Sequence, residues 1–295
     1  MTAKNISSRG RQDKDGSSRD KNSNSKQKSD NQKDKKFRPH PQKLKNFKVK
    51  PGTANTKKES DDIRLNKYIS NSGICSRREA DTYIKSGSAT INGKIVTEMG
   101  YQVKPTDEVR FDGALISPET KRYVLLNKPK NYITTMDDEK DRKTVMELIR
   151  TAAKERIYPV GRLDRNTTGL LLFTNDGEMA KKLTHPKHQV KKLYHVTLDK
   201  KLSISDLQKI ADNFVLDDKM VFVDKISYID DKPKNEIGIE IHSGRNRIVR
   251  RIFEHFGYTV TKLDRVIFAG LTKKNLARGV WRHLTQQEIN NLKMI

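Results

Sequence analysis

The chain has 295 residues, and 61 Lys and Arg against 37 Asp and Glu give it a formal net charge of +24. A basic surplus of this size is typical of proteins that bind a polyanion such as a nucleic acid. The single cysteine excludes an intramolecular disulfide framework, and no apolar stretch suggests a membrane span or a secretory signal. We therefore expect a cytoplasmic protein without membrane contact.

Residues 1–61 are predicted to form a disordered basic tail. Residues 1–60 hold 18 basic and 6 acidic side chains, and Phe37 and Phe47 are the only aromatic residues among them. Such a segment cannot bury enough apolar surface to offset the entropy lost on ordering. Two roles stay open for it: a solubilising tail, or a flexible electrostatic arm on RNA.

Residues 62–118 have the pattern of a small helix–helix–hairpin domain. Apolar residues recur at helical spacing in IRLNKYIS, and Ser76 with Glu79 forms a capping box that opens a second helix. Asn92 and Gly93 stand between two β-prone runs, which predicts a hairpin turn. Six basic residues lie outside the apolar stripes: Arg64, Lys67, Arg77, Arg78, Lys85 and Lys94. The pattern alone leaves open whether they form an ordinary solvated surface or an RNA contact.

The segment RLNKYISNSGICSRREADTYIKSGSATINGKIV resembles the S4 RNA-binding domain. The resemblance rests on the Arg-Leu start, the Ser-Arg-Arg opening of the second helix and the Asn-Gly hairpin. It implies that the six basic residues contact folded RNA through its shape and its phosphates.

Residues 119–295 alternate strand-like and helical segments, which indicates a mixed α+β domain. Strands are expected at KRYVLLNKP, IYPVG, GLLLFTN, KLYHVTL and EIGIEIH, and helices at TVMELIRTAA, GEMAKKL, SISDLQKIADNF and NRIVRRIFEHFG. In the last helix, Val249, Ile252 and Phe253 share one face, and Arg250 is expected on the other.

Asp164 is the main candidate for chemistry, because it lies in a loop between two apolar strands with Arg162 and Arg165 beside it. Physical reasoning alone also allows a structural salt bridge or turn cap. The segment GRLDRNTTGLLLFTNDG resembles the catalytic motif of pseudouridine synthases, most closely the ribosomal RsuA/RluB/RluF family that carries an N-terminal S4 domain. NKPKNYITT, KKLYHV and IEIHSGRNRIVRRIFEHFGYTVTKLDRVIFAGL resemble further segments of that family in the same order.

This resemblance implies an enzyme that isomerises a uridine of ribosomal RNA without a metal or other cofactor, and large-subunit (23S) RNA is the expected substrate. It assigns the catalytic carboxylate to Asp164, as a nucleophile or as a base for the 2′ proton, and the cation beside it to Arg250. Tyr194 would stack on the uracil, and Leu263 would form the pocket wall. The expected RNA contacts in this domain are Lys128, Arg162, Arg165, Arg247 and Arg251.

Two residues depart from the family pattern. Asn131 stands where glycine is usual, and a positive φ is tolerable for Asn. Ile248 replaces a common glutamine, which removes a side-chain amide near the site.

The expected fold is thus α+β: a disordered tail (1–61), an S4 domain (62–118), and a pseudouridine synthase domain (119–295) with a mixed, largely antiparallel sheet. The expected partner is ribosomal RNA or a ribosome-assembly precursor, bound by a monomer. Two alternatives remain: a non-catalytic S4-type assembly factor, and the same enzyme acting on small-subunit RNA.

Overall fold

The structure is a computed structural model that describes residues 62–295. The prediction of a disordered tail over residues 1–61 lies outside the described residues. No helix in the described part of the chain is long and apolar enough to cross a membrane.

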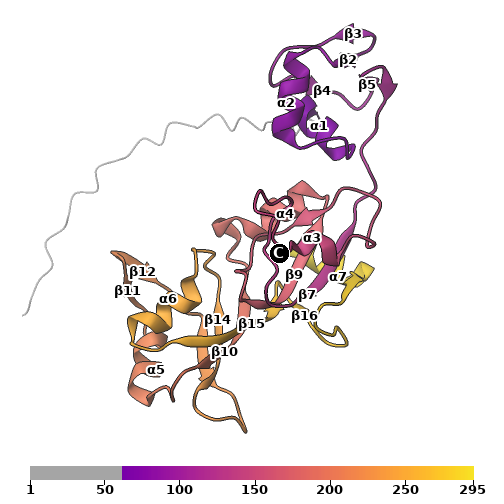
Figure 1. Cartoon of the computed structure of the whole chain (residues 1–295). Coiled ribbons are helices and arrows are strands. Elements are labelled where there is room, and N and C mark those ends of the chain that lie inside the picture. Colours follow the sequence, from indigo (N-terminus) through magenta and orange to yellow (C-terminus); the bar gives the residue numbers. More distant parts are fainter. Residues whose placement is uncertain (1–61) are drawn as a thin grey trace, which may run out of the picture. The chain divides into compact units, whose positions relative to one another are not determined.

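The first domain contains two helices and short strands around its own apolar core (Figure 1). Its elements are β1 (Ile63–Arg64), α1 (Leu65–Asn71), α2 (Arg77–Lys85), β2 (Ala89–Ile91), β3 (Lys94–Ile95), β4 (Gln102–Val103), β5 (Val109–Phe111) and β6 (Ala114–Leu115). Ser76 and Glu79 form the predicted capping box of α2. Asn92 and Gly93 have φ values of 49° and 79°, which matches the tight turn expected between β2 and β3.

The second domain is built on a nine-stranded sheet in the order β13-β14-β10-β15-β9-β7-β17, with β16 on β15 and β8 on β9. These strands are β7 (Tyr123–Lys128), β8 (Tyr158–Pro159), β9 (Thr168–Thr174), β10 (Lys192–Leu198), β13 (Lys225–Tyr228), β14 (Glu236–Ile241), β15 (Val260–Phe268), β16 (Leu271–Thr272) and β17 (Trp281–His283). β15 pairs with β9 in parallel, and the other pairings of this sheet are antiparallel. The predicted mixed, largely antiparallel sheet is confirmed.

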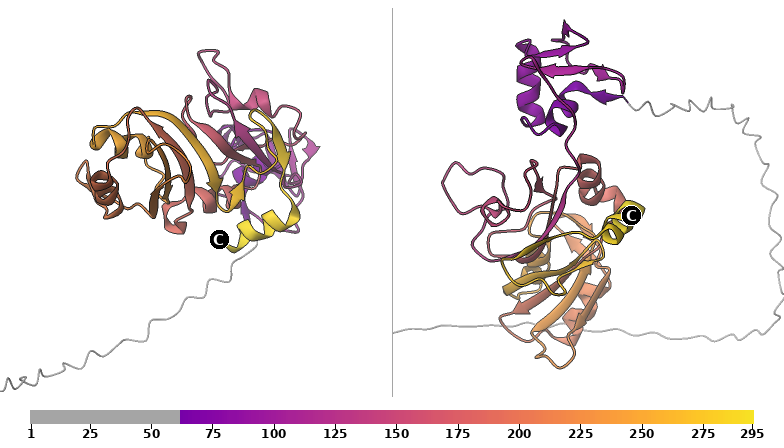
Figure 2. Two further views of the ribbon diagram at one scale, coloured as in Figure 1. Left: turned by 90° about the horizontal axis from the view of Figure 1, so that it is seen from below. Right: turned by 90° about the vertical axis from the view of Figure 1, so that its right-hand side faces the viewer.

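Helices cover both halves of this sheet (Figures 1 and 2). They are α3 (Val145–Leu148), α4 (Gly177–Thr184), the 3-10 helix η1 (Pro186–His188), α5 (Ile204–Ala211), α6 (Ile248–His255) and α7 (Gln286–Met294), and a separate hairpin pairs β11 (Phe214–Leu216) with β12 (Lys219–Val221). α5 and α6 pack beside β10, β14 and β15, and α4 and α7 pack beside β7 and β9.

The helix predicted over TVMELIRTAA is a single turn, so that prediction was wrong in its length. After Leu148 the chain leaves the helical path, and Ile149 and Ala152 pack into the core that lies against β7 and β9. Tertiary burial of these two side chains outweighs the local helical propensity.

Strands β7 and β9 are buried on both faces. Leu125 and Leu172 face one core, and Leu126 and Phe173 face the other. The loop that contains Asp164 leads directly into β9, so its end is attached to the least exposed part of the sheet.

Candidate active site

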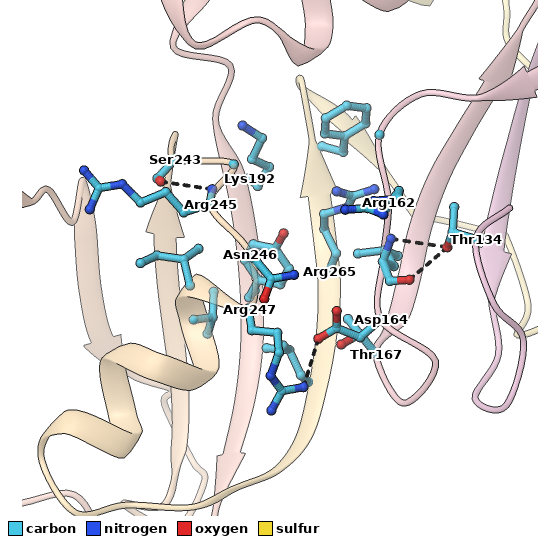
Figure 3. Close-up of a pocket in the computed structure, with 18 of the residues that line it drawn as sticks. Thr134, Arg162, Asp164, Thr167, Lys192, Ser243, Arg245, Asn246, Arg247 and Arg265 are labelled. Atoms are coloured by element: carbon cyan, nitrogen blue, oxygen red, sulfur yellow. Dashed lines mark hydrogen bonds and ion pairs between the residues drawn. The ribbon is translucent and has the colours of Figure 1, made fainter. Parts of the chain in front are cut away.

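A cavity of about 480 Å³ lies between the loop that precedes β9 and the segment that precedes α6 (Figure 3). Strands β10 and β15 supply the wall between them. Of the residues singled out from the sequence, the cavity lining includes Asp164, Tyr194, Leu263, Arg162, Arg165 and Arg247. The fold therefore brings together residues that are about 100 positions apart in the chain.

Two arginines approach the Asp164 carboxylate from the segment around the start of α6. Arg247 Nη1 lies 3.5 Å and Arg250 Nε 3.8 Å from Asp164 Oδ2. The Asp164 side chain is 34% exposed, so the carboxylate is accessible from the cavity but partly shielded from solvent. Two guanidinium groups thus face this carboxylate with the opposite charge.

Arg250 is buried, although the sequence pattern predicted it on the polar face of α6. It is 9% exposed, and its Nη1 donates a hydrogen bond to the carbonyl oxygen of Val260 at 2.8 Å. Its Nε has no hydrogen-bond partner in the described structure. Burial lowers the pKa of the Arg250 guanidinium, and the charge of Arg247 adds to this effect while Asp164 opposes it. The unpaired Nε therefore points to Asp164 as its electrostatic partner.

Arg247 owes its position to the backbone at the start of α6. It has a φ of 47° and immediately precedes the first helical residue, Ile248, which is buried. In Figure 3 its guanidinium reaches toward Asp164. Arg251 instead forms an ion pair with Asp217, so a phosphate contact by Arg251 would have to compete with this carboxylate.

Lys128 does not occupy the surface position that a phosphate contact requires, and this prediction is corrected. Its side chain is fully buried, and its Nζ donates to the carbonyl oxygens of Pro129, Asp164, Arg165 and Thr167 at 2.9–3.3 Å. Burial lowers the pKa of Lys128 to about 8, although the charge of Asp164 opposes part of this shift. The ammonium group therefore holds the Asp164 loop from inside the protein.

The segment after Lys128 supports the same loop from a second side. Asn131 has a φ of 71°, as expected for a residue that replaces glycine, and its N–H donates to the carbonyl oxygen of Arg165 at 2.9 Å. Thr134 Oγ1 donates to the carbonyl oxygen of Leu163 at 2.9 Å and accepts from the N–H of Leu163 at 3.3 Å. These contacts fix the backbone on both sides of Asp164.

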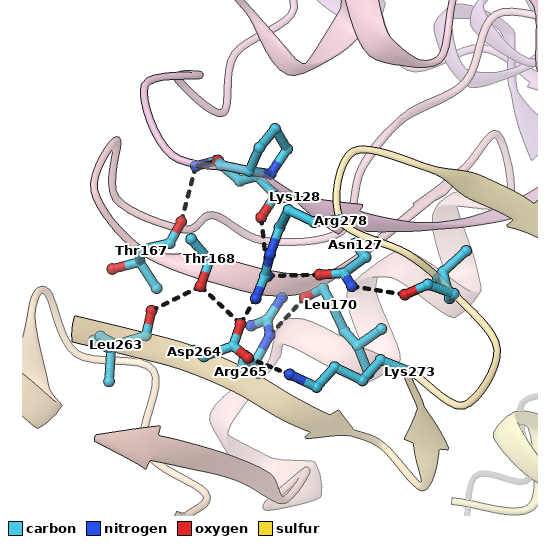
Figure 4. A network of polar contacts seen from close by, with 12 residues as sticks. Asn127, Lys128, Thr167, Thr168, Leu170, Leu263, Asp264, Arg265, Lys273 and Arg278 are labelled. Carbon is cyan, nitrogen blue, oxygen red and sulfur yellow. Dashed lines mark hydrogen bonds and ion pairs between the residues drawn. The ribbon is translucent and has the colours of Figure 1, made fainter. Parts of the chain in front are cut away.

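A polar network around Asp264, which sequence reasoning missed, joins β15 to β9 (Figure 4). Asp264 accepts from Thr168 Oγ1 at 2.7 Å, from Arg278 Nη1 at 2.9 Å and from Lys273. Burial alone would raise the pKa of Asp264, but its hydrogen bonds with Arg278, Lys273 and Thr168 outweigh burial and hold it at about 2. Asp264 therefore stays ionised and links the first residue of β9 to the C-terminal segment.

Sequence reasoning also missed Lys192 and Arg265, which line the cavity. A usable signal was present. Side chains two positions apart in a strand share a face, so Lys192 accompanies Tyr194, and Arg265 accompanies Leu263.

The remaining predicted RNA contacts differ in exposure. Lys67 is partly buried, and the others are exposed: Arg162, Arg165, Arg64, Arg77, Arg78, Lys85 and Lys94. Among the described residues, neither Arg162 nor Arg165 forms an ion pair, so both charges are available at the rim of the cavity. Within residues 62–295, no three His, Cys, Asp or Glu side chains are grouped closely enough to hold a metal ion.

Comparison with known proteins agrees with both parts of this structure. Residues 122–255 match the family model described as RNA pseudouridylate synthase, and residues 63–109 match the S4 domain. A crystal structure of a pseudouridylate synthase superimposes with a TM-score of 0.56 at 31% sequence identity, covering 78% of this chain and 99% of that one.

Two characterised relatives match this chain over most of their own length. The chain is 40% identical over 235 residues to ribosomal large subunit pseudouridine synthase B of Bacillus subtilis, which covers 79% of this chain and 96% of that protein. It is 37% identical over 233 residues to the dual-specificity RNA pseudouridine synthase RluF of Escherichia coli, covering 78% of each. The chain therefore belongs to the RsuA/RluB/RluF family of RNA pseudouridine synthases with an N-terminal S4 domain.

Proposed function

We propose that this enzyme converts a specific uridine of large-subunit ribosomal RNA to pseudouridine, with Asp164 as the catalytic carboxylate. The observation that carries the proposal is the placement of Asp164 in the cavity, within 3.8 Å of both Arg247 and Arg250 and on the same lining as Tyr194 and Leu263. The large-subunit assignment rests on the likeness to the Bacillus subtilis enzyme named above.

The reaction breaks the bond between C1′ and N1 of uridine, turns the base, and joins C1′ to C5, after which the C5 proton leaves. An ionised carboxylate can serve as the nucleophile or remove the 2′ proton, and Arg247 and Arg250 face Asp164 with the opposite charge. Tyr194 is suited to stack on the base inside the cavity. Leu263 supplies an apolar wall that keeps water away from it.

The target nucleotide must leave its stack to enter such a cavity. Extrusion costs a few kcal/mol and costs least where the base is already weakly stacked, so a structured loop is the expected substrate. Arg162 and Arg165 at the rim are placed to contact the phosphates of the displaced strand. Residues 62–118 would hold the folded RNA, and residues 1–61 would add a basic arm. We expect a monomer that acts in the cytoplasm on ribosomal RNA or on an assembly precursor.

The test is tritium release from ribosomal RNA labelled at uridine C5, with each subunit's RNA assayed separately. Wild-type protein should release tritium from large-subunit RNA, and Asp164→Asn should release none while it binds the RNA with an affinity within about threefold. Asp230→Asn is the matched control, because Asp230 is an exposed acid in the segment between β13 and β14. Full activity of Asp164→Asn would refute the catalytic assignment, and release from small-subunit RNA alone would refute the substrate assignment. Binding without release from either RNA or from assembly particles would favour a non-catalytic assembly factor.

A further inference from the structure

The lining of the cavity carries far more positive than negative charge. Its charged members are one carboxylate, Asp164, and six cations: Arg162, Arg165, Lys192, Arg245, Arg247 and Arg265. Arg247 and Arg250 already face Asp164. In Figure 3, Lys192 lies at the upper part of the cavity and Asp164 with Arg247 at the lower part. Asp164 therefore does not neutralise the positive charge in the upper part of the cavity.

Lys192 and Arg265 lie diagonally across the pairing of β10 with β15. In this register Lys192 lies opposite Phe268, and Tyr194 lies opposite Arg265. The Arg265 guanidinium carbon lies 4.5 Å from the centre of the Phe268 ring, so the guanidinium stacks on the residue that faces Lys192. The two cations thus lie on one wall, next to the tyrosine expected to hold the base.

The protein contacts of this pair are neutral. Arg265 is 4% exposed, its Nε donates to the carbonyl oxygen of Leu170 at 2.8 Å, and its Nη2 has no partner among the described residues. Lys192 Nζ donates to the carbonyl oxygen of His242 at 2.7 Å. The neighbouring carboxylate of Asp224 lies 2.9 Å from His242 Nδ1 and is shared with that ring.

Burial lowers the pKa of Lys192 to about 8, with the charge of Arg265 as the next cause. Two shielded cations on one wall, without an acid bound directly to either, carry a desolvation cost that the charge of Asp224 offsets only in part. An anion bound between them would remove this cost.

We propose that Lys192 and Arg265 form a phosphate-binding subsite that holds a phosphodiester next to the extruded uridine. A guanidinium and an ammonium group together present several donors to the oxygens of one phosphate. The proposal rests on the proposed function and adds a task to it. Because the base detaches and turns during the reaction, the nucleotide needs an anchor that does not depend on the base. A fixed phosphate keeps the ribose, and with it C1′, against Asp164 throughout.

The test compares the binding of uridine and of uridine 3′,5′-bisphosphate to full-length protein with the Asp164→Asn change, followed by calorimetry. With Lys192 and Arg265 intact, the bisphosphate should bind at least about tenfold more tightly than uridine. Lys192→Gln should remove most of this advantage and leave the affinity for uridine unchanged. Lys262→Gln is the matched control, because Lys262 is an exposed lysine on β15, and it should keep the advantage. Equal loss in both variants, or no advantage in the parent protein, would overturn the subsite.

Arg265→Gln also removes the bond to Leu170 and the stacking on Phe268, so a loss of binding in that variant would not separate the subsite from the fold. Lys192→Gln carries the test for this reason, and Arg265→Lys, which keeps the charge, should retain part of the bisphosphate advantage. The assay does not need the natural RNA, so it is independent of tritium release. A protein that shows the subsite but releases no tritium from any ribosomal RNA loses the proposed function only. A protein that releases tritium but gains nothing from the phosphates loses the subsite only.

Discussion

Gly169 lies opposite Arg265 in the parallel pairing of β9 with β15, at a separation that leaves no room for a side chain. A Cβ atom at Gly169 would lie 2.2 Å from the carbonyl oxygen and 2.5 Å from the backbone nitrogen of Arg265. Gly169 also has a φ of 106°, which disfavours any other residue. This close approach brings Thr168, and with it the Asp164 loop, against the strand that carries Leu263 and Arg265.

Gly169→Ala should therefore separate the two strands. We expect a loss of at least about 3 kcal/mol in unfolding free energy, since both the overlap with backbone and the positive φ add to the cost. Urea unfolding measures this. Gly279→Ala is the control, because Gly279 has a φ of 83° with no atom within 4 Å of the added Cβ, and it should lose only about 1 kcal/mol. Equal losses in the two variants would show that the positive φ, and not the contact between the strands, causes the loss of stability.

Lys128→Met tests whether Lys128 holds the Asp164 loop or contacts RNA. Four carbonyl oxygens would lose their donor, so we expect a drop in kcat of about 100-fold from misplacement of Asp164, and a loss of about 2–4 kcal/mol in unfolding free energy. RNA affinity and its salt dependence should not change, because the ammonium group is buried. The control is Lys130→Met, an exposed neighbour. If the RNA affinity of Lys128→Met, but not that of Lys130→Met, depended less on salt than the affinity of the wild type, Lys128 would be a phosphate contact after all.

Arg250→Lys tests the buried guanidinium that faces the Asp164 carboxylate. A lysine cannot keep the bond to Val260 and also present a donor where Arg250 Nε now lies 3.8 Å from the carboxylate. We expect kcat for tritium release to fall by about 100-fold to 1,000-fold with little change in KM. Arg251→Lys, one position further along α6, should retain nearly full kcat because its partner is Asp217. A change in KM alone at Arg250 would indicate a binding role instead.

Asp264 makes stability depend on pH in the acid range. Its pKa is about 2 in the folded protein, against an ordinary value near 3.8, so the folded state binds fewer protons than the unfolded state between these values. The stabilisation is thus complete above about pH 4 and is lost as the pH falls through about 2.

Asp264→Asn should cost about 1–3 kcal/mol at pH 7, because Arg278 and Lys273 lose their carboxylate. The gap between wild type and variant should narrow as the pH is lowered from 4 toward 2, measured by urea unfolding at each pH. Asp230→Asn, at an exposed position, should show neither effect. A gap that stays constant down to pH 2 would contradict the role of the ionised Asp264.

The local elements of this protein follow from short stretches of its sequence. The capping box of Ser76 and Glu79 and the turn at Asn92 and Gly93 depend only on neighbouring residues, and both are present as predicted. The alternation of strands and helices and the segment around Asp164 were also readable, because hydrophobic period and motif spacing are local properties. α3 is shorter than predicted because local helical propensity does not record the burial of the residues that follow it.

Only the tertiary structure decided which charged side chains are buried and what they face. Lys128 and Arg250 read as surface cations, yet one is enclosed by four carbonyl oxygens and the other by Val260 and Asp164. Asp264 contacts Lys273 and Arg278 across strand and loop, and Lys192 and Arg265 come to line the same cavity from two different strands. A charge is stable inside a protein only if partners distant in the chain compensate for lost hydration, and no local pattern records those partners.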